Sequence, residues 1–332
     1  MISAHNYSMS RCAPSRSNRT WTNKDGRKAP LIALPFLYFL TALLGPCALA
    51  DPWPAAASGT NIGAGIGVFN AGFEASGLTY HPDHGYIVVG DDGDIALVEE
   101  GGQVTAYEIL GGDFEGIAVK QGVASFAYIA SENLNAILEV ALSDLSSTGK
   151  SWPLELPQSG GLGFEGIAFV PADYAPASWG QSCCGGFFIA GTQADSALRV
   201  FDIDTSVGSD TMISPVTTIA TDYSDVSGLH FSNETRLLYV LHDTANRLTE
   251  ITLLGTKMAQ YETPTSADEE GIVIVPDCSI GTAAVSLADD GGPTVMQYGD
   301  YPIICEAVSQ EVTLPPAVIW LLTRPISDNE SP

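Results

Sequence analysis

The sequence is poor in basic residues, with 13 Lys and Arg against 39 Asp and Glu among its 332 residues. Six of these bases and one acid fall within the first 50 residues, so the remainder has seven bases, 38 acids and a formal net charge of −31. Nucleic acids and anionic membranes would be repelled, so neither is an expected partner. Such a charge also repels itself unless cations sit among the carboxylates, which makes a divalent cation the first partner to expect.

Several signatures of catalytic and cofactor sites are missing. There is no C-x-x-C pair, which argues against a zinc ribbon or a redox pair, and no G-x-S-x-G turn of a serine hydrolase. The glycines at 63, 65 and 67 lack the spacing and setting of a dinucleotide site. Intrinsic disorder is excluded, because 45% of the residues are hydrophobic and can bury a core.

The N-terminal apolar run, Leu31 to Leu44, is shorter than the roughly 20 residues that a membrane-spanning helix needs. A basic stretch from Arg11 to Lys28 precedes it, and Ala48-Leu49-Ala50 follows. This order predicts an export signal over residues 1–50, cleaved after Ala50, with a membrane anchor as the alternative. We therefore expect an exported protein, periplasmic or extracellular, without stable membrane insertion after cleavage, and a linker over 51–65.

Four cysteines follow the predicted signal: Cys183, Cys184, Cys278 and Cys305. Their even number fits an oxidising compartment. We predict a bridge between Cys278 and Cys305. The adjacent Cys183 and Cys184 cannot easily bond to each other without strain.

One short pattern occurs five times at spacings of 39, 50, 62 and 43 residues. Its copies are Glu74-Ala-Ser76-Gly77-Leu78, Asp113-Phe-Glu115-Gly116-Ile117, Gly163-Phe-Glu165-Gly166-Ile167, Asp225-Val-Ser227-Gly228-Leu229 and Asp268-Glu-Glu270-Gly271-Ile272. Each copy is followed by apolar alternation, a turn and a second apolar strand, which indicates strand pairs. The glycine of each copy is expected to allow a close approach between strands or a positive φ.

Units of about 40 residues with up to four strands and no helical periodicity predict an all-β fold, a single β-propeller. Five motifs indicate five blades over residues 66–310. Six blades is the alternative, because the 62-residue spacing has room for a degenerate blade. The segment Ile66 to Asn70 is expected to close the ring as the outer strand of the last blade, and residues 311–332 form a C-terminal tail.

In a blade, the start of the first strand lies beside the end of its antiparallel neighbour, so two sets of acids are expected on one rim. The strand starts carry Asp268 together with several of the predicted ligands. The strand ends align as Glu132, Thr192 and Asp243, and Asp91 fits the same frame. The fifth unit offers Asp289 and Asp290 with one residue of slack. Crowded carboxylates must raise their pKa values, pair with bases or bind a cation. The predicted metal ligands are Glu74, Asp91, Asp113, Glu115, Glu132, Glu165, Asp225, Asp243 and Glu270.

Oxygen ligands favour Ca²⁺, with Mg²⁺ as the second choice. The alternative is that these Asp, Glu and Ser side chains hydrogen-bond backbone amides where each strand begins. Of the histidines, His81 and His84 are expected in a turn on the opposite rim, His230 is expected to pack, and His242 adjoins the acidic rim.

The five motifs in this order, with Leu237-Leu-Tyr-Val-Leu-His-Asp-Thr-Ala-Asn-Arg247 after the fourth, resemble the SdiA-regulated family of bacterial exported proteins over roughly residues 70–300. The resemblance implies a five-bladed propeller distantly similar to NHL-repeat propellers, a calcium site and no assigned catalytic activity. Gly163 and Thr192 depart from the acidic pattern and place the third blade's share of a metal site in doubt.

Two functions follow from these observations. The first is a non-catalytic exported propeller in which Ca²⁺ ties blades together and the acidic rim binds an unidentified small molecule or protein. The alternative is a metal-dependent hydrolase of the lactonase or esterase-like phytase type. The absence of a blade with an unmatched acid and base favours the first.

Overall fold

A computed structural model describes residues 50–120, 122–123, 125–157, 163–264 and 269–306. The predicted cleavage site lies at the start of this range, whereas the rest of the predicted export signal, Asp268 and the predicted C-terminal tail lie outside the described residues. The described chain is all-β and forms five four-stranded antiparallel sheets.

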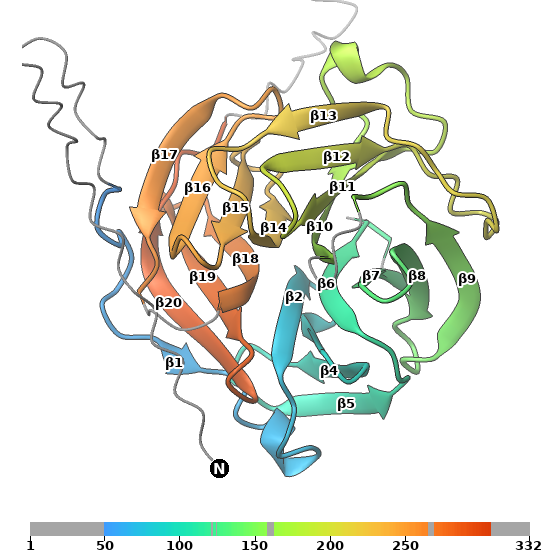
Figure 1. Cartoon of the computed structure of the whole chain (residues 1–332). Helices are drawn as coiled ribbons and strands as arrows, with labels where there is room; N and C mark the ends of the chain where they lie inside the picture. The colour runs from blue at the N-terminus through green and yellow to red at the C-terminus, as the bar shows by residue number, and fades with distance from the viewer. Residues whose placement is uncertain (1–49, 121, 124, 158–162, 265–268, 307–332) are drawn as a thin grey trace, which may run out of the picture. The chain divides into compact units, whose positions relative to one another are not determined.

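Each sheet takes its strands in chain order from the axis outward, except for the outer strand of the last sheet (Figure 1). Blade 1 holds β2 (Ala75–His81), β3 (Gly85–Gly90), β4 (Asp94–Val98) and β5 (Val104–Ile109). Blade 2 holds β6 (Phe114–Val119), β7 (Phe126–Ser131), β8 (Ala136–Ala141) and β9 (Ser147–Pro153). Blade 3 holds β10 (Phe164–Pro171), β11 (Gly186–Thr192), β12 (Ala197–Phe201) and β13 (Thr217–Ala220). Blade 4 holds β14 (Val226–Phe231), β15 (Leu238–His242), β16 (Arg247–Ile251) and β17 (Lys257–Glu262). Blade 5 holds β18 (Glu269–Asp277), β19 (Thr282–Asp289), β20 (Thr294–Pro302) and β1 (Thr60–Asn61).

The inner strands β2, β6, β10, β14 and β18 each contact the next, and β18 contacts β2, so the ring is closed. The prediction of a five-bladed propeller is confirmed, and six blades is wrong. The long third spacing holds extended connections instead of a blade. One of them joins β10 to β11 and contains the short 3-10 helix η2 (Ala177–Trp179), and the other joins β12 to β13.

The closing strand lies earlier in the chain than predicted. Residues 66–68 form the 3-10 helix η1 (Ile66–Val68), and the last blade is completed by Thr60 and Asn61, which pair with Gln297 and Met296 of β20. A two-residue strand carries no apolar alternation, so the sequence pattern could not reveal it. The outer strand of the last blade thus comes from the beginning of the described chain, directly before blade 1, and this links the first and last blades.

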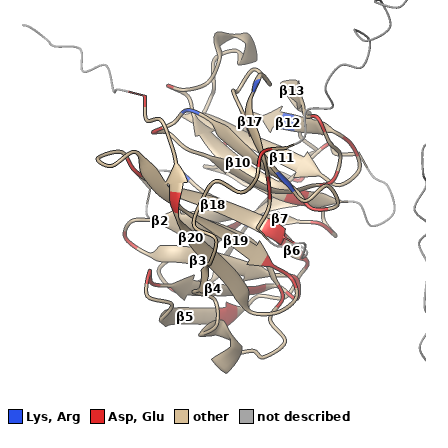
Figure 2. Cartoon of the chain, turned by 90° about the vertical axis from the view of Figure 1, so that its left-hand side faces the viewer, with Lys and Arg blue, Asp and Glu red and all other residues tan. Residues whose placement is uncertain are grey.

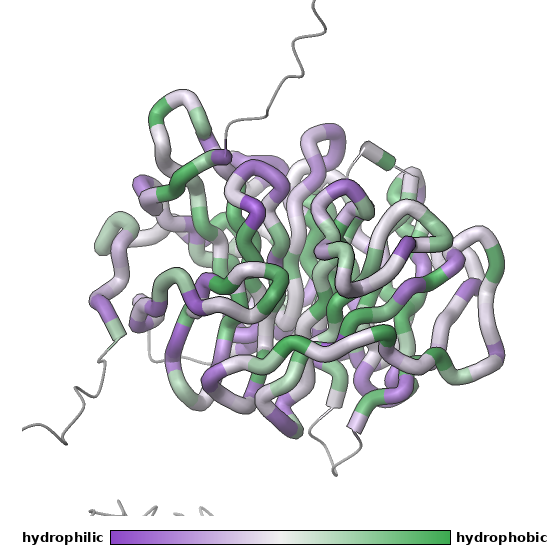
Figure 3. Tube along the Cα trace, turned by 90° about the horizontal axis from the view of Figure 1, so that it is seen from above, coloured by the Kyte–Doolittle hydropathy of each residue, from purple (hydrophilic) through white to green (hydrophobic). Residues whose placement is uncertain are grey.

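The core lies between adjacent blades, where apolar faces of neighbouring sheets meet. On β11, Ile189 packs in one cluster with Val226 and Val240 of blade 4, whereas the next residue, Ala190, packs in a cluster with Tyr128 of blade 2. This alternation is the period-2 pattern of a strand that is covered on both faces. Figure 3 shows hydrophobic residues along the interior strands and hydrophilic residues in the outer loops.

Every inner strand contains a β-bulge at its second residue, where the pairing register with the neighbouring strand shifts by one residue. The bulged residues are Ser76, Glu115, Glu165, Ser227 and Glu270. A bulge leaves its residue out of the ladder and re-aims the side chain. The repeated motif is therefore the signature of a bulge at the same height in each blade.

The glycine after each bulge allows the inner strands to approach closely. A Cβ on Gly116 would lie 2.3 Å from the carbonyl oxygen of Glu165, and one on Gly77 would lie 2.7 Å from the Cα of Gly116. Gly271 closes the ring, since its Cβ would lie 3.0 Å from the Cα of Gly77. None of the five motif glycines has a positive φ, so close approach is the reason for glycine here.

Both cysteine pairs are disulfides. The predicted Cys278–Cys305 bridge is confirmed, with Cα atoms 5.7 Å apart. Cys183 and Cys184 also form a bridge, although strain argues against a bond between neighbours. Their loop is held by Asp202, whose Oδ2 accepts a hydrogen bond from the Cys183 amide at 2.9 Å. No helix of the described residues is long and apolar enough to span a membrane.

Candidate metal centre

Among the described residues, three positions of blades 1 to 4 and two positions of blade 5 meet at one end of the ring, and we call this set the acidic mouth. They are the residue two before the bulge (Glu74, Asp113, Gly163, Asp225), the bulged residue (Ser76, Glu115, Glu165, Ser227, Glu270) and the residue after the second strand (Asp91, Glu132, Gln193, Asp243, Asp290). The Asp91 amide donates to the Glu74 carbonyl at 3.2 Å, and the Glu132 amide donates to the Asp113 carbonyl at 3.0 Å. These bonds join the start of the first strand to the end of the second, as antiparallel pairing requires.

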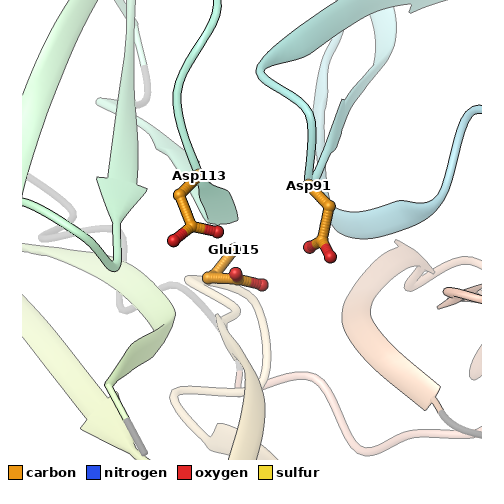
Figure 4. Close-up of side chains that lie close together, drawn as sticks. All are labelled: Asp91, Asp113 and Glu115. Carbon is orange, nitrogen blue, oxygen red and sulfur yellow. The ribbon is translucent and has the colours of Figure 1, made fainter. Parts of the chain in front are cut away.

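The tightest group in the mouth consists of Asp91, Asp113 and Glu115. One carboxylate oxygen from each residue can be chosen so that the three atoms lie within 4.8 Å of one another. Asp91 follows β3 of blade 1, whereas Asp113 and Glu115 belong to the beginning of β6 in blade 2. Figure 4 shows the three carboxyl groups converging on the space between these two segments. The group therefore spans a blade boundary, with Glu115 buried and the two aspartates half-buried.

The other predicted ligands belong to the same electrostatic group but lie outside this cluster. Charge on Glu165 acts on Glu115 and Glu270, and charge on Glu132, Asp113 and Asp225 acts on Glu165. Glu74 acts on Asp91, and Asp243 acts on Glu270. All nine predicted ligands thus lie at one mouth. Three of them, Asp91, Asp113 and Glu115, lie close enough together to bind a single ion.

Crowding and burial raise the pKa values of the acids nearest the axis. Burial, followed by the charge of Glu165, raises the pKa of Glu115 to about 11. Burial with the charges of Glu132 and Asp91 raises the pKa of Glu165 to about 8, and burial with the charge of Glu165 raises that of Glu270 to about 9. The pKa of Asp91 rises to about 6, again through burial first and then the charge of Asp113. Without a cation, these carboxyls keep protons that free carboxyls release.

The bases of the described chain are engaged elsewhere. Ion pairs join Lys150 to Glu139, Arg199 to Asp195, Arg236 to Glu306, Arg247 to Glu262 and Lys257 to Asp222. The remaining base, Lys120, lies over the rings of Tyr128, Phe169 and Phe188 and donates to Thr205 at 2.8 Å. Figure 2 shows how far acidic positions outnumber basic ones on the ribbon. A proton or a cation therefore remains to neutralise the cluster.

The two serines at bulge positions have a structural role. Ser227 Oγ donates to the Glu269 carbonyl of blade 5 at 2.7 Å, and Ser76 Oγ donates to the Phe114 carbonyl of blade 2. Each serine joins its inner strand to that of the next blade. The alternative interpretation predicted hydrogen bonds to backbone amides, and it is wrong for these serines, which donate to carbonyls instead. It is correct for Glu132 and Asp225, whose carboxylates accept hydrogen bonds from the Gly163 and Thr244 amides, each at 2.9 Å. The glutamates at the bulge positions are charge-coupled to one another.

The register of the strands corrects the predicted alignment of strand ends. Phe164 pairs with Thr192, just as Phe114 pairs with Ser131 and Val226 with His242. Gln193, not Thr192, is therefore equivalent to Glu132 and Asp243. In blade 5 the register selects Asp290 from the two residues that the sequence left open. The position of the bulge is what the sequence alignment lacked, because it defines which residue of the second strand lies opposite the motif.

The histidines do not belong to the cluster. His242 is fully buried at the end of β15 beside the ring of Tyr223, and burial lowers its pKa to about 4. His81 ends β2, at the far end of the inner strand from the acidic mouth, as predicted.

The donor set fits a hard divalent cation. The side chains within reach are all carboxylates, and Asp91, Asp113 and Glu115 can offer up to six oxygens if each binds through both. The raised pKa values mark carboxyls that are poorly solvated and would be stabilised in the charged form by a cation. Thiolate or imidazole ligands, which zinc prefers, are absent from this cluster.

Fold and site together define the class of protein: a five-bladed β-propeller with an acidic mouth at one end of its channel. No protein-family model and no curated protein matches the chain. Among solved structures it is similar to the hydrazine synthase of Kuenenia stuttgartiensis, with 14% identity and a TM-score of 0.41 over 66% of this chain and 56% of that chain. It is also similar to streptogramin B lyase, with 15% identity and a TM-score of 0.39 over 70% of each chain.

Proposed function

We propose that this protein is an exported calcium-binding β-propeller, a non-catalytic binding module of the SdiA-regulated type. The observation that supports the proposal is the convergence of Asp91, Asp113 and Glu115 from two blades within 4.8 Å. A cation there joins blade 1 to blade 2 and releases the protons that crowding retains. Ca²⁺ is the expected ion because it tolerates irregular carboxylate cages, whereas Mg²⁺ demands near-octahedral geometry.

The remaining mouth acids give the module its binding face. Asp225 and Asp243 lie beyond the cluster, and their charges act on Glu165 and Glu270 near the axis. A bound ion with open positions, surrounded by carboxylates, suits a ligand that carries its own oxygen donors or positive charge. The partner at this face is thus expected to be a small molecule or protein with those groups.

Elemental analysis combined with thermal unfolding tests this proposal. Protein purified from an exported fraction should carry about one calcium per chain, and its melting temperature should fall when the ion is chelated and recover on adding Ca²⁺. Protein without stoichiometric metal, melting at the same temperature in chelator and in calcium, contradicts the proposal. N-terminal sequencing of the same material tests export, with Asp51 as the expected first residue.

A metal-dependent hydrolase is the second candidate. One observation favours it: Glu165 is charge-coupled to Asp91 and Asp113 of the cluster, and burial with the charges of its neighbours raises its pKa to about 8 in the metal-free protein, which marks it as a candidate proton donor or acceptor. A panel of lactones, aryl esters and phosphoesters, assayed with calcium and with chelator, separates the candidates. Calcium-dependent turnover that Glu165→Gln abolishes supports the hydrolase, and the absence of turnover across the panel supports the binding module.

A further inference from the structure

The channel ends, opposite the acidic mouth, in a cavity of about 300 Å³. We call it the far cavity; its walls include Tyr80, His81, His230, Glu234, Ile274 and Pro276. These residues come from blades 1, 4 and 5, and Gly122 adds a contact from blade 2. The volume is at the lower end of the range of small-molecule sites. A ligand here would touch four blades at once.

The far cavity is separated from the acidic mouth by the packed interior of the channel. Two small spaces, of about 10 Å³ and 30 Å³, lie along the described inner strands. Apolar side chains line both, among them Ile117, Ile167 and Leu229. Spaces of this size hold about one or two waters, so neither of them offers an organic ligand a passage between the two ends. The far cavity is therefore a separate site.

The polar groups of the far cavity select against anions. Burial, followed by the charge of His84, lowers the pKa of His81, and burial lowers that of His230 to about 4, so both rings are neutral at pH 7. The wall contains no Lys or Arg, but it does contain the carboxylate of Glu234. A second carboxylate, Glu100, lines a neighbouring pocket and accepts a hydrogen bond from the Tyr80 hydroxyl at 3.0 Å. Among the residues of the wall, an anionic group would meet negative charge and no base, since the nearby Arg236 pairs with Glu306 and Lys120 lies over aromatic rings.

The same wall offers hydrogen bonds and apolar surface. Nδ1 of His81 accepts a hydrogen bond from the Asp83 amide at 3.1 Å, so the neutral ring carries its proton on Nε2. Ile274, Val275 and Pro276 form an aliphatic side of the cavity, and the Tyr80 ring forms an aromatic side. Aromatic rings attract cations as well as apolar groups.

We propose that the far cavity binds a small organic amine with a compact apolar or aromatic body. The ammonium group pairs with Glu234, and the body packs between Tyr80 and Ile274. The proposal is independent of calcium at the acidic mouth, because the packed channel separates the two sites. It adds a ligand site at the face where the turns between first and second strands lie.

Three probes of nearly equal shape test the charge preference: 2-phenylethylamine, 2-phenylethanol and phenylacetate. Binding is measured by ligand-observed NMR and calorimetry on the full chain with saturating calcium, which keeps the acidic mouth filled. The amine should bind, the alcohol should bind at least fivefold more weakly, and phenylacetate should not bind. Glu234→Gln should weaken the amine at least fivefold and leave the alcohol unchanged.

Two control variants locate the binding. Glu99→Gln removes a carboxylate from the same face but outside the far cavity and should leave amine binding unchanged. Asp91→Asn alters the acidic mouth and should also leave it unchanged. The proposal is overturned if none of the probes binds, if phenylacetate binds as well as the amine, or if amine binding is reduced equally by Glu99→Gln or by Asp91→Asn.

Discussion

Glu132 occupies the space that a side chain at Gly163 would need. Its Oε1 accepts a hydrogen bond from the Gly163 amide at 2.9 Å, and a Cβ on Gly163 would lie 2.0 Å from its Cγ. The other described blades begin this motif with Glu74, Asp113 or Asp225. Blade 3 lacks an acid at that position because the carboxylate of blade 2 already lies there.

Replacing Gly163 with Ala should displace the Glu132 side chain and break its hydrogen bond to the backbone. We expect a loss of about 1 kcal/mol in the free energy of unfolding, the typical contribution of one such bond. Chemical denaturation measures it, with Gly72→Ala as the control, because a Cβ there meets only the Asn70 side chain at 3.6 Å. Equal stability of the two variants would show that Glu132 relocates without cost.

A larger loss is expected for Gly116→Ala, because the added methyl group would lie 2.3 Å from a backbone carbonyl oxygen of the next blade. Backbone cannot rotate away as a side chain can, so the inner strands must separate. We expect about 3 kcal/mol of destabilisation, at the upper end of the usual range for overpacking. A denaturation midpoint close to that of the Gly72→Ala control would contradict the role given to the glycine ring.

The serine contacts between blades predict a smaller and specific effect. Ser227→Ala removes a hydrogen bond of 2.7 Å to the Glu269 carbonyl and leaves that buried acceptor without this donor. We expect a loss of about 1 to 2 kcal/mol in the free energy of unfolding. Ser206→Ala, a change in an exposed loop, is the comparison, and if both cost the same the contact contributes nothing to ring closure.

The crowded carboxyls predict an unusual dependence of stability on pH in calcium-free protein. Folding raises the pKa values of Glu165 to about 8 and Glu270 to about 9, so the folded chain retains protons that the unfolded chain releases. Their contribution to stability is fully present below the unfolded value of about pH 4.3 and is lost as the pH rises through the folded values. In chelator, the denaturation midpoint should therefore decrease as the pH is raised from 6.5 to 9.

Calcium should reverse this trend, since it binds the deprotonated carboxylates and its affinity rises with pH. In saturating Ca²⁺ the midpoint should stay level or rise over the same range. A chelated protein whose midpoint is constant from pH 6.5 to pH 9 would show that the mouth carboxyls titrate as free groups.

Much of the fold follows from the repeated motif. Glycine follows Ser76, Glu115 and their equivalents for the same physical reason in every blade, because the inner strands approach one another closely there. Five copies of the motif therefore predict five blades. The closing strand was beyond prediction because Thr60 and Asn61 are two residues whose only pattern is their pairing with β20. The bond between Cys183 and Cys184 was also missed, since neighbouring cysteines say nothing of the loop conformation that Asp202 holds.

The candidate site was predicted less completely than the fold. Sequence alone placed all nine acids at one mouth, because strand starts and ends meet there in any antiparallel blade. It could not show that Asp91, Asp113 and Glu115 converge, since this depends on the bulge that re-aims Glu115 toward the neighbouring blade. Gln193 was missed because a one-residue frame shift is invisible without strand register.

Calorimetric titration of calcium into chelator-treated, dialysed protein tests the central claim most directly. The wild-type chain should bind about one Ca²⁺ with high affinity, and Asp91→Asn should weaken that binding at least tenfold, which is about 1.4 kcal/mol. Asp83→Asn, an acid in the turn after β2 at the opposite end, should bind as the wild type does. Wild-type protein that takes up no calcium, or an Asp91→Asn variant that binds it with unchanged affinity, would contradict a metal centre at the acidic mouth.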